Sequence, residues 1–84
     1  MIGILCPTYW EAARFIRREG LKRESLSTYT LNKKDRSLRL EISGIGPDSA
    51  RKACEKLIAF NPSVLICCGF AGALRPRLRV GDLV

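Results

Sequence analysis

Twice along this sequence, a short apolar run typical of a buried strand leads through a turn into an amphipathic helix. The first such run is residues 1–6, and the second is residues 37–43, where apolar and charged side chains alternate. A continuous apolar run over residues 63–68 follows the second helix. Strands that alternate with helices place those helices over the faces of a sheet, so the pattern predicts an α/β fold.

Both predicted helices carry start signals and stop signals. Thr8 and Glu11 have the spacing of a capping box, which predicts a helix over residues 9–19 that stops at Gly20. The second helix is predicted over residues 47–60, with Pro47 at its first position. The apolar stripe expected on the first helix comprises Trp10, Ala12, Ala13, Phe15 and Ile16.

The remaining segments complete a β-α-β-β-α-β order. Residues 26–31 and 37–43 are predicted to form a hairpin, with Leu40 on the buried face and with Arg39 and Glu41 on the wet face. Residues 63–68 are predicted to form a central parallel strand covered on both faces, and residues 80–84 to begin another strand. We therefore expect residues 1–84 to be the N-terminal part of a single domain whose C-terminal part is absent from this chain.

Charge and composition exclude several classes of function. Lys and Arg total 15, Asp and Glu total 8 and His is absent, giving a net charge of +7. Without His there is no Ser-His-Asp triad, Cys-His pair or His-ligated metal within this chain. Neither a signal peptide nor a membrane-spanning stretch is recognisable, so we expect a soluble cytoplasmic protein without a membrane partner. The basic set Arg14, Arg17, Arg18, Lys22 and Arg23 lacks interleaved aromatic residues and is interpreted as a solvated face rather than a nucleic-acid surface.

The four cysteines show no C-x-x-C pair and no zinc-like spacing. They are predicted to be buried, reduced thiols that act as small apolar side chains. A catalytic cysteine is the alternative, although no base lies near any of them in the sequence. They are Cys6, Cys54, Cys67 and Cys68.

Three positions could carry chemistry. Gly44 and Gly46 open the second helix, where backbone N–H groups could bind an anion, although a tight turn explains them as well. The small residues 68–73 follow a buried strand, where ligands of open α/β sheets bind, or where strand and helix pack closely. Glu11 either caps its helix or presents a carboxylate to a water or a sugar hydroxyl, and both roles are compatible.

Taken in order, these features resemble the N-terminal part of the nucleoside phosphorylase/nucleosidase superfamily, which includes purine nucleoside phosphorylases, methylthioadenosine/S-adenosylhomocysteine nucleosidase, futalosine hydrolase and the hopanoid-associated phosphorylases. Three stretches carry the resemblance, which extends over essentially all 84 residues. They are Ile2-Gly3-Ile4-Leu5 followed by Glu11, then Ile42-Ser43-Gly44-Ile45-Gly46, and finally residues 64–84 with Cys-Gly-Phe-Ala-Gly-Ala-Leu-Arg-Pro and Val-Gly-Asp-Leu-Val.

The resemblance implies a three-layer αβα sandwich on a mixed central sheet, and cleavage of the N-ribosidic bond of a purine or related nucleoside. It implies no metal and no organic cofactor, with phosphate possible as a co-substrate. Glu11 is expected to hold the attacking water, and Phe70, Ala71 and Gly72 to line the ribose and anion region. The family's S-G-I-G segment corresponds to residues 43–46, which include Gly44 and Gly46.

Two departures from the family pattern favour a hydrolase over a phosphorylase. Phe70 stands where many relatives have Ser, and the first turn, residues 6–9, lacks the phosphorylases' glycine-and-arginine phosphate loop. The family's ribose-binding Glu and general-acid Asp also fall beyond this chain, so we expect the 84 residues alone to be inactive. We expect a nucleoside-binding homo-oligomer. The alternative is a non-catalytic α/β module that self-associates or pairs with another chain through an exposed sheet edge.

Overall fold

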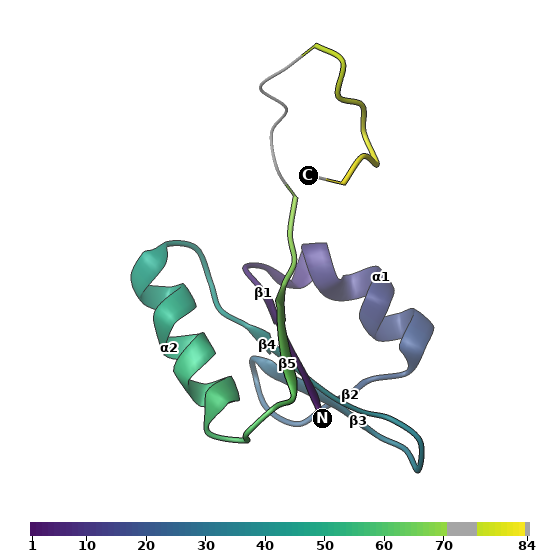
Figure 1. The fold of residues 1–84 in the computed structure, drawn as a ribbon, viewed down its shortest axis with the longest axis vertical. Helices are drawn as coiled ribbons and strands as arrows, with labels where there is room; N and C mark the ends of the chain where they lie inside the picture. The colour runs from purple at the N-terminus through teal and green to yellow at the C-terminus, as the bar shows by residue number, and fades with distance from the viewer. Residues whose placement is uncertain (71–75, 84) are drawn as a thin grey trace.

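The structure, a computed structural model, describes residues 1–70 and 76–83 (Figure 1). Within these residues the chain forms two helices and a five-stranded sheet, which confirms the predicted α/β class. The elements are β1 (Ile2–Cys6), α1 (Tyr9–Glu19), β2 (Lys22–Arg23), β3 (Thr28–Asn32), β4 (Ser37–Ile42), α2 (Pro47–Ile58) and β5 (Val64–Cys67).

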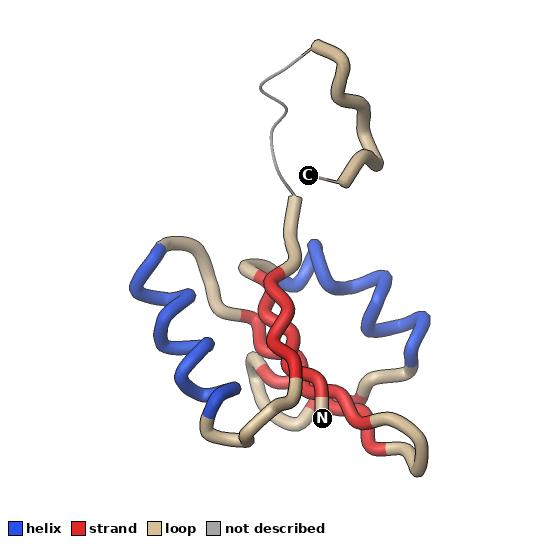
Figure 2. The backbone as a smooth tube through the Cα atoms, viewed as in Figure 1, coloured by secondary structure: helices blue, strands red, loops and turns tan. Residues whose placement is uncertain are grey.

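The sheet is mixed, with the strand order β2-β3-β4-β1-β5. β1 pairs in parallel with both β4 and β5, so that Ile4 lies between Leu40 and Ile66. β3 pairs antiparallel with β2 and with β4. Figure 2 shows the strands in red, with the two helices in blue on either side. The carboxyl ends of β4, β1 and β5 therefore lie along one edge of the sheet, and the turns that follow these strands meet there.

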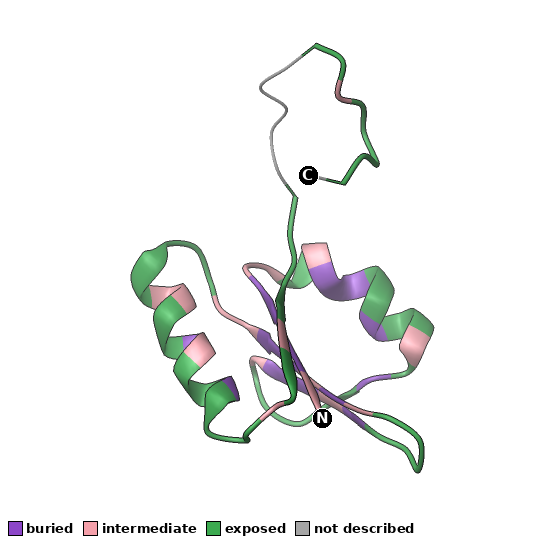
Figure 3. Cartoon of the chain, viewed as in Figure 1, coloured by how far each residue is buried: buried purple, intermediate pink, exposed green. Residues whose placement is uncertain are grey.

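One helix covers each face of the sheet (Figure 1). Ala12 and Ile16 of α1 pack with side chains from β1, β3 and β4 in the larger core cluster, which includes Leu40. Ala53 and Leu57 of α2 pack with Leu5 on the opposite face. These buried positions line the inner sides of both helices (Figure 3). Packing on both faces holds in place the three strand–turn junctions, which are the points where β4, β1 and β5 lead into the segments that follow them.

Local hydrogen bonds explain where α1 begins and ends, as predicted. The Thr8 side chain accepts from the Glu11 backbone N–H at 3.4 Å, and the Glu11 carboxylate accepts from the Thr8 backbone N–H at 3.3 Å. Gly20 closes the helix with φ of 75°, a left-handed conformation that favours glycine. The capping box therefore places Glu11 in the first turn, directly after β1.

The prediction of a wet face on β4 is wrong for Glu41, which is only 3% exposed. Glu41 lies opposite Leu5 in the register, on the face that α2 covers. Alternation along β4 correctly separates the residues of the two faces, but both faces are covered. A hairpin read by itself cannot show that a helix later in the chain packs on its second face.

The position of β5 also differs from the prediction. β5 is parallel, as expected, but it forms an edge of the sheet and pairs only with β1 among the described strands. Val64 and Ile66 are exposed as a result, and so are Cys67 and Cys68. The expectation of a central strand with buried thiols is thus wrong here, because an apolar run does not determine the position of its strand in the sheet.

Three smaller differences complete the comparison. β2 was not predicted, and the described part of the expected last strand, residues 80–83, contains turns and no strand. Trp10, predicted to lie on the buried stripe of α1, is 80% exposed, because it lies roughly a third of a turn from the centre of the stripe.

Among the described residues, neither helix is long and apolar enough to cross a bilayer.

Candidate functional site

The three strand–turn junctions at the carboxyl edge of the sheet are joined by backbone hydrogen bonds. The Ser43 N–H donates to the Cys6 carbonyl at 2.9 Å, and the Gly44 N–H donates to the Pro7 carbonyl at 2.9 Å. On the other side of β1, the Cys68 N–H donates to the Leu5 carbonyl at 2.8 Å. The β1–α1 turn therefore lies between the β4–α2 turn and the segment that follows β5.

Glu11 connects two of these junctions through its carboxylate. Oε2 accepts from the Thr8 N–H as part of the capping box, and Oε1 accepts from the Phe70 backbone N–H at 3.1 Å. Gly69 lies close by, since a Cβ atom there would be 3.5 Å from Glu11 Oε1 and 3.4 Å from Pro7 Cδ. Each carboxylate oxygen has a second lone pair, so Glu11 can still accept a hydrogen bond from a ligand.

A surface groove of about 590 Å³ adjoins this carboxylate. Two neighbouring rows of α1 side chains contribute to its lining, one formed by Trp10, Arg14 and Arg17 and the other by Glu11, Phe15 and Arg18. Its size lies within the usual range of small-molecule sites, about 300–1,000 Å³. The residues that line it are Trp10, Glu11, Ala13, Arg14, Phe15, Arg17, Arg18 and Phe70.

The structure thus brings two of the predicted site residues, Glu11 and Phe70, into contact, although they are far apart in the sequence. The Phe70 side chain is 81% exposed, so its observed role is the backbone N–H that holds Glu11. The predictions for Ala71 and Gly72 lie outside the described residues.

Gly44 and Gly46 have φ angles of 84° and 108°, which favour glycine at both positions of the tight turn. They lie at the same sheet edge as Glu11 but do not line the groove. The Gly44 N–H already donates to Pro7, and Pro47 has no N–H to offer. Their observed role is to shape the turn into α2, and anion binding by them stays a prediction.

Cys6, a thiol near the candidate site, is a poor nucleophile. Cys6 is buried, and burial, with additional contributions from Cys68 and Glu11, raises the pKa of its thiol to about 11. At neutral pH this thiol is protonated almost entirely. All four cysteines are free thiols. Within residues 1–70 and 76–83, no group of three or more Cys, Asp or Glu side chains is arranged to hold a metal ion.

A second carboxylate, Glu41, was not recognised from the sequence as a buried group. It accepts hydrogen bonds from Ser27 (2.7 Å), Thr28 (2.6 Å) and Lys56 (2.8 Å). Burial raises its pKa, but the hydrogen bond and charge of Lys56, together with the two hydroxyl groups, outweigh burial and leave the pKa below its ordinary value. Ser27 directly precedes β3, Thr28 begins it and Lys56 lies on α2, so this carboxylate joins the sheet to α2.

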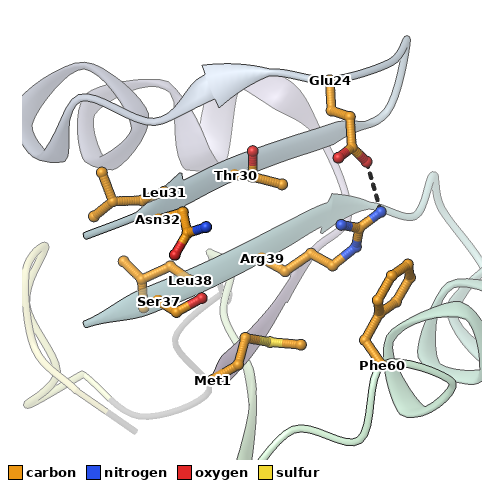
Figure 4. A pocket seen from close by; sticks show the side chains of 9 residues that line it. All are labelled: Met1, Glu24, Thr30, Leu31, Asn32, Ser37, Leu38, Arg39 and Phe60. Carbon is orange, nitrogen blue, oxygen red and sulfur yellow. Dashed lines mark hydrogen bonds and ion pairs between the residues drawn. The ribbon is translucent and has the colours of Figure 1, made fainter. Parts of the chain in front are cut away.

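Another hollow, of about 240 Å³, lies near the amino ends of β1 and β4 (Figure 4). Arg39 is its main charged group, and its guanidinium donates to Glu24 at 2.6 Å and lies 3.7 Å from the centre of the Phe60 ring (Figure 4). The cation is therefore already partnered. Ligands of open α/β sheets bind at the opposite, carboxyl ends of the strands, so we assign this hollow a structural role.

One helix on each face of a mixed sheet, with a helix-anchored carboxylate at the carboxyl edge, defines an α/β protein of the type that binds ligands beyond its parallel strands. The family model of the Phosphorylase superfamily matches residues 1–84, and the chain belongs to this superfamily. The resemblance to nucleoside phosphorylases and nucleosidases is thereby confirmed at the level of the superfamily. No significant match was found among curated proteins or among solved structures.

Proposed function

We propose that this chain forms part of an enzyme that cleaves the N-ribosidic bond of a purine or related nucleoside, with water or phosphate as the nucleophile. The superfamily is enzymatic and supports this class of reaction. The observation that carries the proposal is the position of Glu11, whose carboxylate lies at the carboxyl edge of the sheet beside a groove of ligand size. We propose that no metal or organic cofactor takes part.

The proposed role of Glu11 is to orient the attacking water or a sugar hydroxyl. Its two oxygens are held by the Thr8 and Phe70 N–H groups, so the carboxylate is fixed before a substrate arrives. A fixed acceptor orients the O–H of a water for attack on the anomeric carbon. A phosphate dianion at the same place would be repelled by the carboxylate, which favours water over phosphate as the nucleophile.

A single carboxylate does not complete such a reaction. The departing base requires a proton from a second group, as in glycoside hydrolysis, where two groups act on opposite sides of the bond. Glu11 is the only acidic residue that the structure describes in the groove. We therefore propose that a group outside the groove's described residues protonates the base, and that the 84-residue chain alone is inactive.

The proposal is tested with the protein in the form that its natural host produces, alongside the 84-residue chain. Each is incubated with adenosine, inosine and uridine, with and without phosphate, and base release is measured. We expect the native form to release base and Glu11→Gln to lower kcat by at least about 100-fold. Glu55→Gln is the matched control, because it removes an equal charge from an exposed position on α2.

Three results would contradict parts of the proposal. Absence of base release by the native form from every nucleoside would overturn the reaction class. Full activity of Glu11→Gln, with an unchanged circular dichroism spectrum, would remove Glu11 from the mechanism. Robust base release by the 84-residue chain would show that it already contains the acid.

The edge position of β5 supports a second candidate function, self-association. β5 pairs with β1 on one side only among the described strands, and Val64 and Ile66 are exposed along it. A second copy could pair antiparallel through its own β5 and extend the sheet across both chains. We propose this homodimer as the alternative. Light scattering after size exclusion should show a dimer that Ile66→Lys converts to a monomer, and a monomeric wild-type chain at high concentration would contradict it.

A further inference from the structure

We propose that the groove along α1 binds a purine nucleotide, with the purine stacked on exposed aromatic side chains and the phosphate held by arginines of α1. This inference rests on the proposed function only in taking a purine nucleoside as the core of the ligand. It adds a substrate class, a nucleoside that carries a phosphate, and it assigns a role to Arg14, Arg17 and Arg18.

The first observation is the pair of exposed aromatic side chains at one end of the groove. Trp10 precedes Glu11 in α1, and Phe70 is held against Glu11 through its backbone N–H. The Tyr9 and Trp10 rings meet in a T-shaped arrangement, with 5.8 Å between the ring centroids, and Trp10 is still 80% exposed. Exposed aromatic rings beside one groove offer faces on which a base can stack, and stacking on a base contributes about 1–3 kcal/mol.

The second observation is the charge of the same groove. Arg14, Arg17 and Arg18 are all exposed, and no carboxylate among the described residues forms an ion pair with any of them. Arg17 and Arg18 lie in the last turn of α1, where the helix dipole favours positive charge. Arg14 lies in the middle of the helix, so the dipole does not explain it. Three guanidinium groups without partners form a binding surface for a phosphate.

The third observation is the spacing between these groups. Trp10 and Arg14 are four residues apart on one helix, so their side chains are neighbours, with about 5–6 Å between Cβ atoms. Glu11 lies in the adjacent row. A ligand whose purine stacks on Trp10 can therefore present its phosphate to Arg14 while its sugar lies beside Glu11. The phosphate then contacts the arginines, away from the carboxylate.

The experiment uses the 84-residue chain labelled with ¹⁵N. Trp10 is the only tryptophan, so its indole N–H signal reports on the groove without ambiguity, and the Phe70 amide reports on the Glu11 contact. AMP, adenosine, inorganic phosphate and single-stranded oligoadenylate are titrated separately. We expect AMP to shift both signals and to bind about tenfold more tightly than adenosine or phosphate, because a charge-assisted contact adds to stacking.

Two variants separate the groove from the general positive charge of the chain. Arg14→Gln should abolish most of the preference for AMP over adenosine. Lys34→Gln, which removes an equal charge from the exposed turn between β3 and β4, should preserve that preference. Trp10→Leu should weaken binding of AMP and of adenosine alike, and circular dichroism confirms that each variant is folded.

Each other outcome overturns the inference. Equal affinity for adenosine and AMP would show that the arginines do not contact the ligand. If inorganic phosphate binds as tightly as AMP, the arginines bind a free anion and the purine contributes nothing. If oligoadenylate binds more tightly per site than AMP, the groove is a nucleic-acid site. None of these results touches base release by the native form, so failure of this inference and failure of the proposed function remain distinguishable.

Discussion

The buried carboxylate of Glu41 gives the sharpest test of how this small fold is stabilised. It is 3% exposed and accepts three hydrogen bonds, from Ser27, Thr28 and Lys56. A hydrogen bond to a charged acceptor contributes about 1.5–3 kcal/mol, against about 0.5–1.5 kcal/mol for a neutral one. Glu41→Gln retains the shape but replaces one carboxylate oxygen with an NH₂ group, which cannot accept a hydrogen bond. Either Thr28 or the pair Ser27 and Lys56 then loses its acceptor, and the remaining bonds lose charge assistance.

The expected loss is about 2–3 kcal/mol in the free energy of unfolding at neutral pH, since bonds within one network are not additive. For a domain of this size, each kcal/mol lowers Tm by about 4–8 °C, which gives about 8–24 °C. Urea unfolding followed by far-UV circular dichroism measures the change. Lys56→Gln should cost less, about 0.5–1 kcal/mol, because the lysine side chain is 59% exposed.

The effect should also depend on pH with a known sign. Because the pKa of Glu41 is below its ordinary value of 4.5, its ionised form stabilises the fold above that value, and the contribution is lost as the pH falls through the lower folded pKa. The difference between wild type and Glu41→Gln should therefore shrink in acid. Glu55→Gln, at an exposed position of α2, should change stability by less than about 0.5 kcal/mol. A Glu41→Gln variant that matches this control would refute the reasoning.

Four further predictions concern other parts of the fold. In the folded chain at pH 8, mass spectrometry should show iodoacetamide modifying the exposed Cys67 and Cys68 before the buried Cys6, and equal labelling of all three would contradict the raised pKa of about 11 for Cys6. Because that pKa is raised from 9.0 to about 11, stability that depends on the neutral Cys6 thiol should be present below pH 9 and be lost as the pH rises from 9.0 through about 11, which urea unfolding at each pH measures. Leu57→Ala should lower the free energy of unfolding by about 2–5 kcal/mol, since Leu57 is fully buried, and urea unfolding that shows less than 1 kcal/mol would argue against the α2 core. Thr8→Ala should cost about 0.5–1 kcal/mol by removing a rather long capping bond, and an unchanged Tm would show that the cap contributes nothing.

The elements that local signals specify were predicted accurately. The capping box joins residues three apart, so Thr8 and Glu11 determine the start of α1 within a few residues of chain. Gly20 ends the helix for an equally local reason, its left-handed backbone conformation. The glycine turn into α2 was predicted in the same way, and the parallel direction of β5 was predicted from its continuous apolar run. The same signals place Glu11 in the first turn of α1, beside the carboxyl end of β1, as expected.

The exposure of side chains could not be predicted in the same way. Glu41 is buried because α2 packs over the second face of β4, and Ile66 is exposed because β5 lies at an edge. Both facts depend on pairings between segments far apart in the chain. Trp10 was predicted to be buried because its helical spacing places it at the margin of the apolar stripe. Whether a residue at that margin is buried depends on how much of the helix the sheet covers, and Trp10 lies outside the covered part.

The sequence by itself determined the α/β class, the two helices with their caps, the superfamily and the candidate carboxylate Glu11. Only the tertiary structure decided that the Phe70 N–H holds that carboxylate, and that Trp10 and Phe70 share one groove with Arg14. The physical reason is the range of the interactions. Capping bonds and amphipathic spacing act over a few residues, whereas the groove forms where β5 lies beside β1 and brings residue 70 to the first turn of α1.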